Sequence, residues 1–374
     1  MKRVVGKSSL VTYPLESWAR IGQGTEGVVH KSKGRCVKTY SSPLTDVELE
    51  RIEAAARLSK ILPGFAWPSE IALDSATGAA VGFVMDHVSG CTLETINQQV
   101  CDQDGNEILL VEDEKVHLAL QVAQAVAAAH AHVGPRIVLG DVLKSGNLMI
   151  DLESVSATFV DTASVNLFGF RDASGEVKDS WSTLNTPGYV PKEVLANPAA
   201  IPSQDADLFA LAVLLFELLF GKPPHEPKSS NHTVGLDPDD AVRRGLYLRW
   251  VRQPDFEAPT YDAIDVPDEI DRIFRAAFLA SSRRPDAAEW CAALNAWHDA
   301  IRIVPEAPVA EPSEPRVPKT ALDRISDFAT WGIVAYLLSQ VATGLLDRAI
   351  PGAAQAVPIP GRQIGPALFR EIFR

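Results

Sequence analysis

The chain is poor in cysteine, methionine and aromatic residues: of 374 residues, 4 are cysteine, 3 are methionine and 7% are aromatic. The cysteines Cys36, Cys91, Cys101 and Cys291 form no CxxC pair and show no metal-ligand spacing. This pattern argues against a disulfide scaffold and against a zinc site, and it predicts a cytoplasmic protein with free thiols.

Positive charge is also in the minority, with 35 Lys and Arg residues against 48 Asp and Glu residues, a formal net charge of -13 and a pI of about 5.1. Phosphate contacts need clustered basic side chains, so we expect no nucleic-acid partner. Residues 1–14 begin with basic residues but contain no apolar core of the ~7–15 residues typical of a signal peptide.

Long hydrophobic runs are scarce. The exception is Phe328–Leu346, which contains 19 residues without a charge and is long enough to cross a bilayer. Polar residues and glycines dilute the run, and no cluster of positive charge closely precedes it. We therefore favour a helix that docks on a partner or on the rest of the chain, with a membrane anchor as the alternative.

What is present is ordinary globular composition, 46% hydrophobic and 22% charged. Residues 304–320 are rich in proline and glutamate and predict an extended linker. The sequence thus divides into a main domain over residues 1–303, this linker, and a helical tail over residues 321–374.

The stretch Leu139–Asn147, LGDVLKSGN, places Asp141, Lys144 and Asn147 on a short loop between apolar runs. A second acid, Asp161, ends another mostly apolar run. An acid to orient a hydroxyl, a lysine near the transferred group, and an amide and an acid to hold magnesium are what a phosphoryl-transfer site needs. Surface turns use the same residues, so the pattern alone is weak evidence.

A glycine-rich stretch near the N-terminus, Gly22–Gly27, lies between two expected strands. Its glycines Gly22, Gly24 and Gly27 lack the Cβ atoms that would block the approach of phosphates to the backbone. Lys38 falls on the next strand at hairpin distance, where its ammonium could reach phosphate oxygens. A tight hairpin with a solvated lysine is the alternative. The flanking strands argue against a dinucleotide-binding fold and a Walker-type loop.

Residues 46–62 have apolar side chains at helical spacing, with a cap at Thr45 or Asp46. Glu53 lies among small apolar neighbours and is the expected helix partner of Lys38. Further strands are expected at Glu70–Leu73 and Ala80–His87, and residues 86–88 would present backbone groups to an adenine ring.

Later helices are expected at 113–132, 208–220, 237–252, 268–279 and 286–303, whereas the segment from Asp161 to Thr186 looks irregular. The helix at 208–220 is apolar nearly all round, which predicts a place in the domain centre. Asp207, in its first turn, is either a helix cap or a holder of the Leu139–Asn147 backbone.

Together these pieces resemble the eukaryotic-type protein kinase fold over about residues 15–300. The resemblance implies an α+β, bilobal protein. Its N-lobe, about residues 10–88, would be a small antiparallel sheet with one helix. Its C-lobe, about residues 89–303, would be mostly helical, followed by the C-terminal helical tail.

The resemblance also implies roles for individual residues, with ATP and Mg²⁺ as cofactors. The catalytic group would be Asp141, Lys144 and Lys38; the nucleotide site Gly22, Gly24, Gly27, Val29, Lys38, Glu53, Asp86 and Val88; the metal ligands Asn147 and Asp161; and the structural and regulatory residues Thr186, Glu193, Asp207 and Arg284. Within this last group, Arg284 would pair with Glu193, which ends the activation segment (residues 161–193).

More narrowly, GDVLKSGNLMID and NTPGYVPKEVL look like a bacterial kinase group in which Gly-Asp replaces Arg-Asp. That resemblance implies a signalling role, protein substrates, and association with a von Willebrand A-type protein and a metal-dependent phosphatase.

The chain departs from the kinase pattern at three points. Leu139-Gly140 replaces His-Arg, so no arginine there can bind a phosphate on the activation segment, and we expect activity without its phosphorylation. Asp161-Thr162-Ala163 replaces Asp-Phe-Gly. The interval from Asp141 to Asn147 is one residue longer than usual, so the loop must bulge or the aim of Asn147 must change.

The predicted function is ATP- and Mg-dependent transfer of a γ-phosphoryl group to Ser or Thr of proteins, with Asp141 accepting the hydroxyl proton. A pseudokinase that binds ATP as a scaffold is the first alternative, favoured by the lengthened loop and by Leu139-Gly140. A small-molecule kinase is the second, although such enzymes normally lack the Thr186–Glu193 segment.

Overall fold

The structure, a computed structural model, describes residues 3–23, 27–98, 110–172, 174–182, 185–226, 228–229, 236–279 and 283–303. All of them lie in the first of two compact units, residues 1–305. The expected linker and tail, including Phe328–Leu346, lie outside the described residues.

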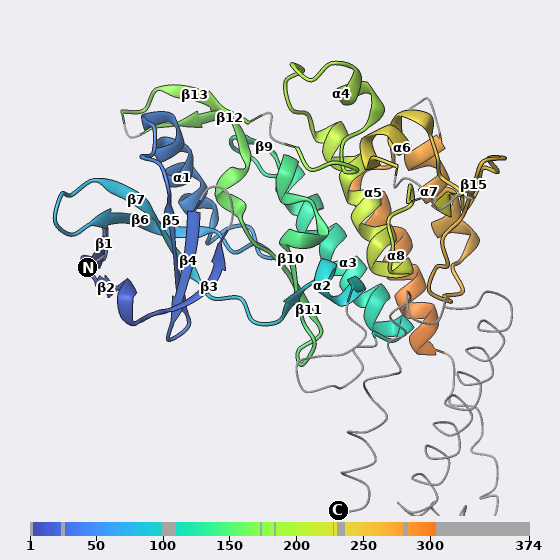
Figure 1. Cartoon of the computed structure of the whole chain (residues 1–374), viewed down its shortest axis with the longest axis horizontal. Coiled ribbons are helices and arrows are strands. Elements are labelled where there is room, and N and C mark those ends of the chain that lie inside the picture. Colours follow the sequence, from blue (N-terminus) through green and yellow to red (C-terminus); the bar gives the residue numbers. More distant parts are fainter. Residues whose placement is uncertain are drawn as a thin grey trace, which may run out of the picture. The chain divides into compact units, whose positions relative to one another are not determined.

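The described chain forms a β-rich N-lobe and a mainly helical C-lobe (Figure 1). The strands are β1 (Arg3–Gly6), β2 (Thr12–Pro14), β3 (Ala19–Gln23), β4 (Gly27–Ser32), β5 (Arg35–Tyr40), β6 (Pro68–Asp74), β7 (Ala80–Asp86), β8 (Cys91–Thr92), β9 (Arg136–Val138), β10 (Leu148–Asp151), β11 (Ser156–Phe159), β12 (Asn166–Arg171), β13 (Val177–Ser180), β14 (Lys228–Ser229) and β15 (Phe256–Glu257). The helices are α1 (Asp46–Leu58), α2 (Leu93–Gln98), α3 (Glu112–His130), α4 (Lys192–Ala196), α5 (Gln204–Phe220), α6 (Pro238–Arg244), α7 (Asp268–Leu279) and α8 (Ala287–Ile303).

The N-lobe sheet is antiparallel and has seven strands in the order β2-β1-β6-β7-β5-β4-β3. It starts earlier than the predicted boundary near residue 10, because β1 and β2 form a hairpin that extends the sheet beside β6. Val4 and Tyr13 of this hairpin are buried and pack with Val37 and Val84. This apolar contact makes the hairpin part of the lobe.

Helix α1 begins at a capping box, in which the side chain of Thr45 accepts from Glu48 N and the carboxylate of Glu48 accepts from Thr45 N. Its buried face presents Ile52, Ala55 and Leu58, so the helix covers one side of the N-lobe (Figure 1).

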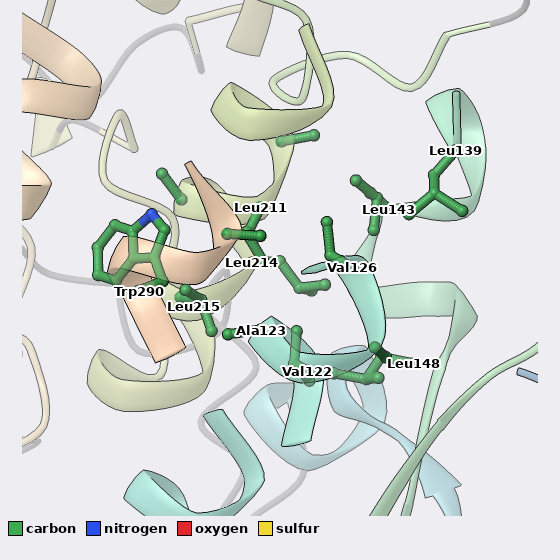
Figure 2. Packing of buried hydrophobic residues seen from close by; sticks show 14 of the residues in the cluster. Val122, Ala123, Val126, Leu139, Leu143, Leu148, Leu211, Leu214, Leu215 and Trp290 are labelled. Atoms are coloured by element: carbon green, nitrogen blue, oxygen red, sulfur yellow. The ribbon is translucent and has the colours of Figure 1, made fainter. Parts of the chain in front are cut away.

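The C-lobe core forms around α3 and α5. Leucine, valine and alanine side chains of these helices meet Leu139, Leu143 and Leu148 from the loop side, and Trp290 of α8 lies at the other end of the cluster (Figure 2). Helix α5 is buried all round, as its composition predicts. Burial of this much apolar surface gives the loops at its edge a rigid support.

Two expectations about secondary structure are wrong. The segment after Asp161 contains the hairpin β12–β13, and β12 also pairs with β9, since Leu167 and Phe170 find buried positions there. The helix expected at 237–252 is the shorter α6, because Gly245 adopts a left-handed φ of 64° and its N–H bonds back to Ala241 O.

Candidate active site

A cleft of about 950 Å³ lies between the two lobes. Its described lining includes most of the residues predicted for nucleotide, metal and catalysis: Gly22, Gly27, Val29, Lys38, Asp86, Val88, Asp141, Lys144, Asn147 and Asp161. Gly24 lies outside the described residues. The fold therefore brings segments more than a hundred residues apart in sequence to one cavity.

The two described glycines of the glycine-rich stretch differ in what a side chain would meet at each position. A Cβ on Gly27 would lie 2.1 Å from Thr39 O, so the pairing of β4 with β5 itself excludes a side chain there. A Cβ on Gly22 would meet only Val29, at 3.9 Å. Gly22 thus leaves open space that a ligand can use, whereas Gly27 serves the sheet.

Lys38, on β5, is buried at 8% exposure, and its ammonium pairs with Asp161 Oδ1 at 2.5 Å. Glu53, predicted as its helix partner, pairs instead with Lys7 Nζ. The structure differs from the prediction because the hairpin β1–β2, not recognised in the sequence, brings Lys7 over α1.

Asp161 stands at the start of the activation segment in a left-handed conformation, with φ 58° and ψ 33°. Thr162, where phenylalanine would be expected, is buried and donates to Ala66 O at 2.8 Å. This bond fixes the backbone beside Asp161 and holds its carboxylate toward Lys38. Asp161 and Asn147 line the same cleft and offer carboxylate and amide oxygens, the donor type that Mg²⁺ prefers when phosphates complete its shell.

Asp141 lies in a closed group with Thr186 and Lys144. Thr186 Oγ1 donates to Asp141 Oδ1 at 2.6 Å, and Lys144 Nζ donates to Asp141 Oδ2 at 2.5 Å and to Thr186 Oγ1 at 3.1 Å. The catalytic-loop acid is thus oriented by two partners, one from its own loop and one from the activation segment.

The extra residue in this loop is absorbed inward. Val142 and Leu143 are both fully buried, and Leu143 points into the C-lobe core (Figure 2). Asn147 Nδ2 donates to Asp141 O at 3.1 Å, which ties the two ends of the loop together. Asn147 therefore still lines the cleft. The longer interval from Asp141 to Asn147 produces no bulge toward solvent at Val142 and Leu143.

Asp207 settles the choice left open by the sequence. Ser203 caps α5, with its side chain accepting from Ala206 N. Asp207 is 1% exposed and accepts from Leu139 N at 2.7 Å and from Gly140 N at 2.8 Å, while His130 Nε2 lies 2.9 Å away. It holds the backbone of the catalytic loop on the central helix.

At the other end of the activation segment, Arg284 pairs with Glu193 at 2.6 Å and also with Asp205 at the start of α5. The arginine is mostly buried, and it links α4 to the core helix. At the hinge, Asp86 pairs with Arg35 at 2.8 Å, and His87 N donates to Gly34 O.

A buried polar group that the sequence did not reveal lies beneath the loop. Tyr189 OH is 2.7 Å from Glu217 Oε1 and accepts from Ser145 N at 3.0 Å. Burial raises the pKa of Glu217 to about 7, and the charges of Glu226 and Glu94 add to the rise, whereas hydrogen bonds from Tyr189 and Ser145 oppose it. A glutamate inside an apolar helix was the only available sequence signal.

Comparison with known proteins agrees with this geometry. Residues 15–264 match the family model of the protein kinase domain. The chain is 24% identical over 301 residues to protein kinase YegI of Escherichia coli, covering 75% of this chain and 44% of that protein. It is 25% identical over 218 residues to LRR receptor-like serine/threonine-protein kinase ER2 of Oryza sativa subsp. japonica, covering 56% of this chain and 20% of that protein.

Among solved structures, the ROP18 kinase domain in complex with AMP-PNP and sucrose superposes with a TM-score of 0.52 at 16% identity, covering 81% of this chain and 87% of that one. The bilobal α+β fold predicted from the sequence is confirmed. The chain belongs to the protein kinase family. It spans less than half the length of these two curated relatives.

In the part of the chain that the structure describes, no helix is both long and apolar enough to cross a membrane.

Proposed function

We propose that this protein is an ATP- and Mg-dependent protein kinase that phosphorylates Ser or Thr of protein substrates in bacterial signalling. The observation that carries the proposal is Asp141, which accepts from Lys144 and Thr186. Asp141 and Lys144 line the same cleft as Lys38, Asn147 and Asp161. An acid oriented by a lysine and a segment threonine is ready to position an incoming hydroxyl group.

In this mechanism, Asp141 orients the acceptor hydroxyl and takes its proton as the new bond from that oxygen to the γ-phosphorus forms. The bond between the γ-phosphorus and the oxygen that bridges it to the β-phosphate breaks, and ADP leaves with that oxygen. Lys144 offsets negative charge on the transferred phosphoryl group, and Lys38 contacts the phosphates that stay with ADP. Asn147 and Asp161 would hold Mg²⁺, which would supply positive charge to offset the charge of the phosphates. Asp86 and Val88 would take the adenine ring at the hinge. Fixed charges around the transferred group supply most of the rate enhancement.

One observation favours the alternative of a nucleotide-binding pseudokinase. Glu53 is engaged by Lys7 and not by Lys38. If that arrangement persists with nucleotide bound, the protein senses ATP as a scaffold and transfers nothing. A kinase acting on small molecules is the second alternative, and a panel of peptide, sugar and aminoglycoside acceptors separates the two substrate classes.

The test is transfer of labelled phosphate from ATP to a generic protein acceptor. Replacing Asp141→Asn should lower kcat about 10³-fold, because the proton acceptor is lost, while the ATP-induced thermal shift persists. Lys38→Ala should weaken both activity and ATP binding. The matched control is Asp151→Asn, the acid that ends β10 and accepts from Glu153 N, and this variant should retain wild-type rates. Equal labelling by wild type and Asp141→Asn would refute the catalytic assignment, and a thermal shift without labelling would support the scaffold.

The proposal extends to partners and location. A von Willebrand A-type protein and a metal-dependent phosphatase are the proposed partners, and the kinase domain is proposed to act in the cytoplasm. Phosphosite mapping after incubation with ATP and candidate partner proteins would identify the substrate.

A further inference from the structure

A buried amide lies between the catalytic loop and the activation segment. Asn166 is the first residue of β12, is 3% exposed, and is paired in register with Val138 of β9. Its Oδ1 accepts from Ser182 N at 2.7 Å. Ser182 precedes Thr186 by four residues, and Thr186 donates to Asp141. The amide therefore fastens the part of the segment that leads to the catalytic acid.

The other side of this amide packs on the catalytic loop. A Cβ added to Gly140 would lie 2.7 Å from Asn166 Nδ2, and Gly140 has a φ of 55°, a value that residues with side chains rarely adopt. Gly140 N is held from behind by Asp207 Oδ1. The absence of a side chain at Gly140 thus leaves room for the Asn166 amide beside the catalytic loop.

The small cavity on one side of this amide is unfavourable for a phosphate. A small cavity of about 50 Å³ adjoins Gly140, Asn166 and Ser182, and none of its described lining residues is a lysine or arginine. The carboxylates of Asp141 and Asp207 line the same cavity and would repel a phosphate inside it. Lys38 and Lys144 lie instead on the larger cleft, which Asn166 and Ser182 also line.

We propose that Asn166 is a positioning residue that fastens the activation segment to the catalytic loop through Ser182 N, so that this junction needs no phosphorylation. The inference rests on the proposed kinase function for its kinetic consequence, but the contact itself can be tested without activity. The residue acts through its bond from Ser182 N, and because Asn166 also lines the cleft, the Kd for ATP is measured beside the acceptor kinetics.

The test combines hydrogen exchange and steady-state kinetics on the full chain. In Asn166→Ala, exchange at the Ser182 amide should accelerate about tenfold, because its buried acceptor is gone, while α3 amides keep their wild-type rates and report an intact fold. The ratio kcat/KM for an acceptor peptide should fall about tenfold, through a higher KM, a lower kcat or both. The Kd for ATP should change by less than about twofold. Gly140→Ala, which displaces the amide from the other side, should reproduce the fast exchange.

Two controls separate this from general loosening. Gln121→Ala removes a different side-chain amide, one that donates to Val155 O and accepts from Ala157 N. This variant should leave hydrogen exchange at the Ser182 amide unchanged. Ser182→Ala keeps the backbone N–H and should retain both slow exchange and activity. Wild-type exchange at Ser182 in Asn166→Ala would overturn the inference, as would a loss of activity in Ser182→Ala that a phosphomimetic Ser182→Asp restores. Faster exchange in a protein that never labels a peptide would support the contact and contradict the proposed function.

Discussion

At the residue scale, the site depends on a few buried polar side chains that each satisfy several partners. Asp207 is the clearest case, since one carboxylate accepts from two backbone N–H groups of the catalytic loop and faces His130. A buried donor without an acceptor costs more than the bond itself contributes, so such residues control the loop geometry.

Replacing Asp207→Ala should lower the free energy of unfolding by about 3–5 kcal/mol, because two buried N–H groups lose their acceptor. Activity should fall along with it, as the loop loses its anchor. The measurement is urea unfolding followed by fluorescence. Asp299→Ala, an exposed acid of α8, is the control and should change stability by less than about 0.5 kcal/mol. Similar unfolding curves for the two variants would contradict the anchoring role.

Glu217 contributes to folding stability in a way that depends on pH, and the sign of that dependence follows from its pKa shift. Its pKa rises from 4.5 in the unfolded chain to about 7 in the fold, mainly through burial. The folded state therefore binds the extra proton between these values, and this contribution to stability is complete below about pH 4.5 and lost as the pH rises through about 7. A shift of this size corresponds to about 3 kcal/mol.

The measurement is the difference in Tm between wild type and Glu217→Gln from pH 5 to 8. Relative to the variant, wild type should lose stability as the pH rises. The comparison is needed because burial lowers the pKa of His225 to about 4, and that histidine acts with the opposite sign over an overlapping range. A difference that does not vary with pH would show that Glu217 titrates normally.

At the element scale, the catalytic loop and the activation segment are held by the elements around them. The loop takes its extra residue inward, and the segment begins as a hairpin whose strand β12 pairs with β9. Lys178 of this hairpin pairs with Glu50 of α1, and Arg57 of α1 donates to Arg171 O. Exposed pairs of this kind add little stability each, so most of the hold comes from strand pairing and buried apolar contacts.

Leu143 is the element-scale test. Leu143→Ala should cost about 3 kcal/mol of unfolding free energy, since it leaves a cavity beneath the loop, and it should reduce kcat through a loosened Asp141. Leu152→Ala, in which the leucine is 40% exposed, is the matched control and should cost less than about 1 kcal/mol. If Leu143→Ala lowers the free energy of unfolding by no more than the control does, this side chain does not anchor the longer loop.

At the scale of the whole molecule, the chain divides after Pro305, and all described elements belong to the first unit. The described residues of the cleft, the catalytic loop and the activation segment all belong to this unit.

We expect that a truncated protein comprising residues 1–305 folds. Its ATP-induced rise in Tm should equal that of the full chain within about 2 °C. Differential scanning fluorimetry with Mg-ATP makes the comparison, with Lys38→Ala in both backgrounds as the non-binding control. Loss of the nucleotide response on shortening would show that residues 306–374 contribute to the site. Membrane fractionation of the two forms tests the alternative anchor at Phe328–Leu346.

The sequence by itself determined the bilobal fold, through its resemblance to the protein kinase pattern, and the buried position of α5, through its apolar composition. It also predicted most of the residues that line the cleft, because short motifs and apolar periodicity are local properties. Only the tertiary structure decided that Glu53 pairs with Lys7, that Leu143 is buried in the longer loop, and that Asn166 lies beside Gly140 and accepts from Ser182 N. Each of these depends on which distant segments share a space, and a buried polar group or an extra residue finds its partner only once the chain has packed around it.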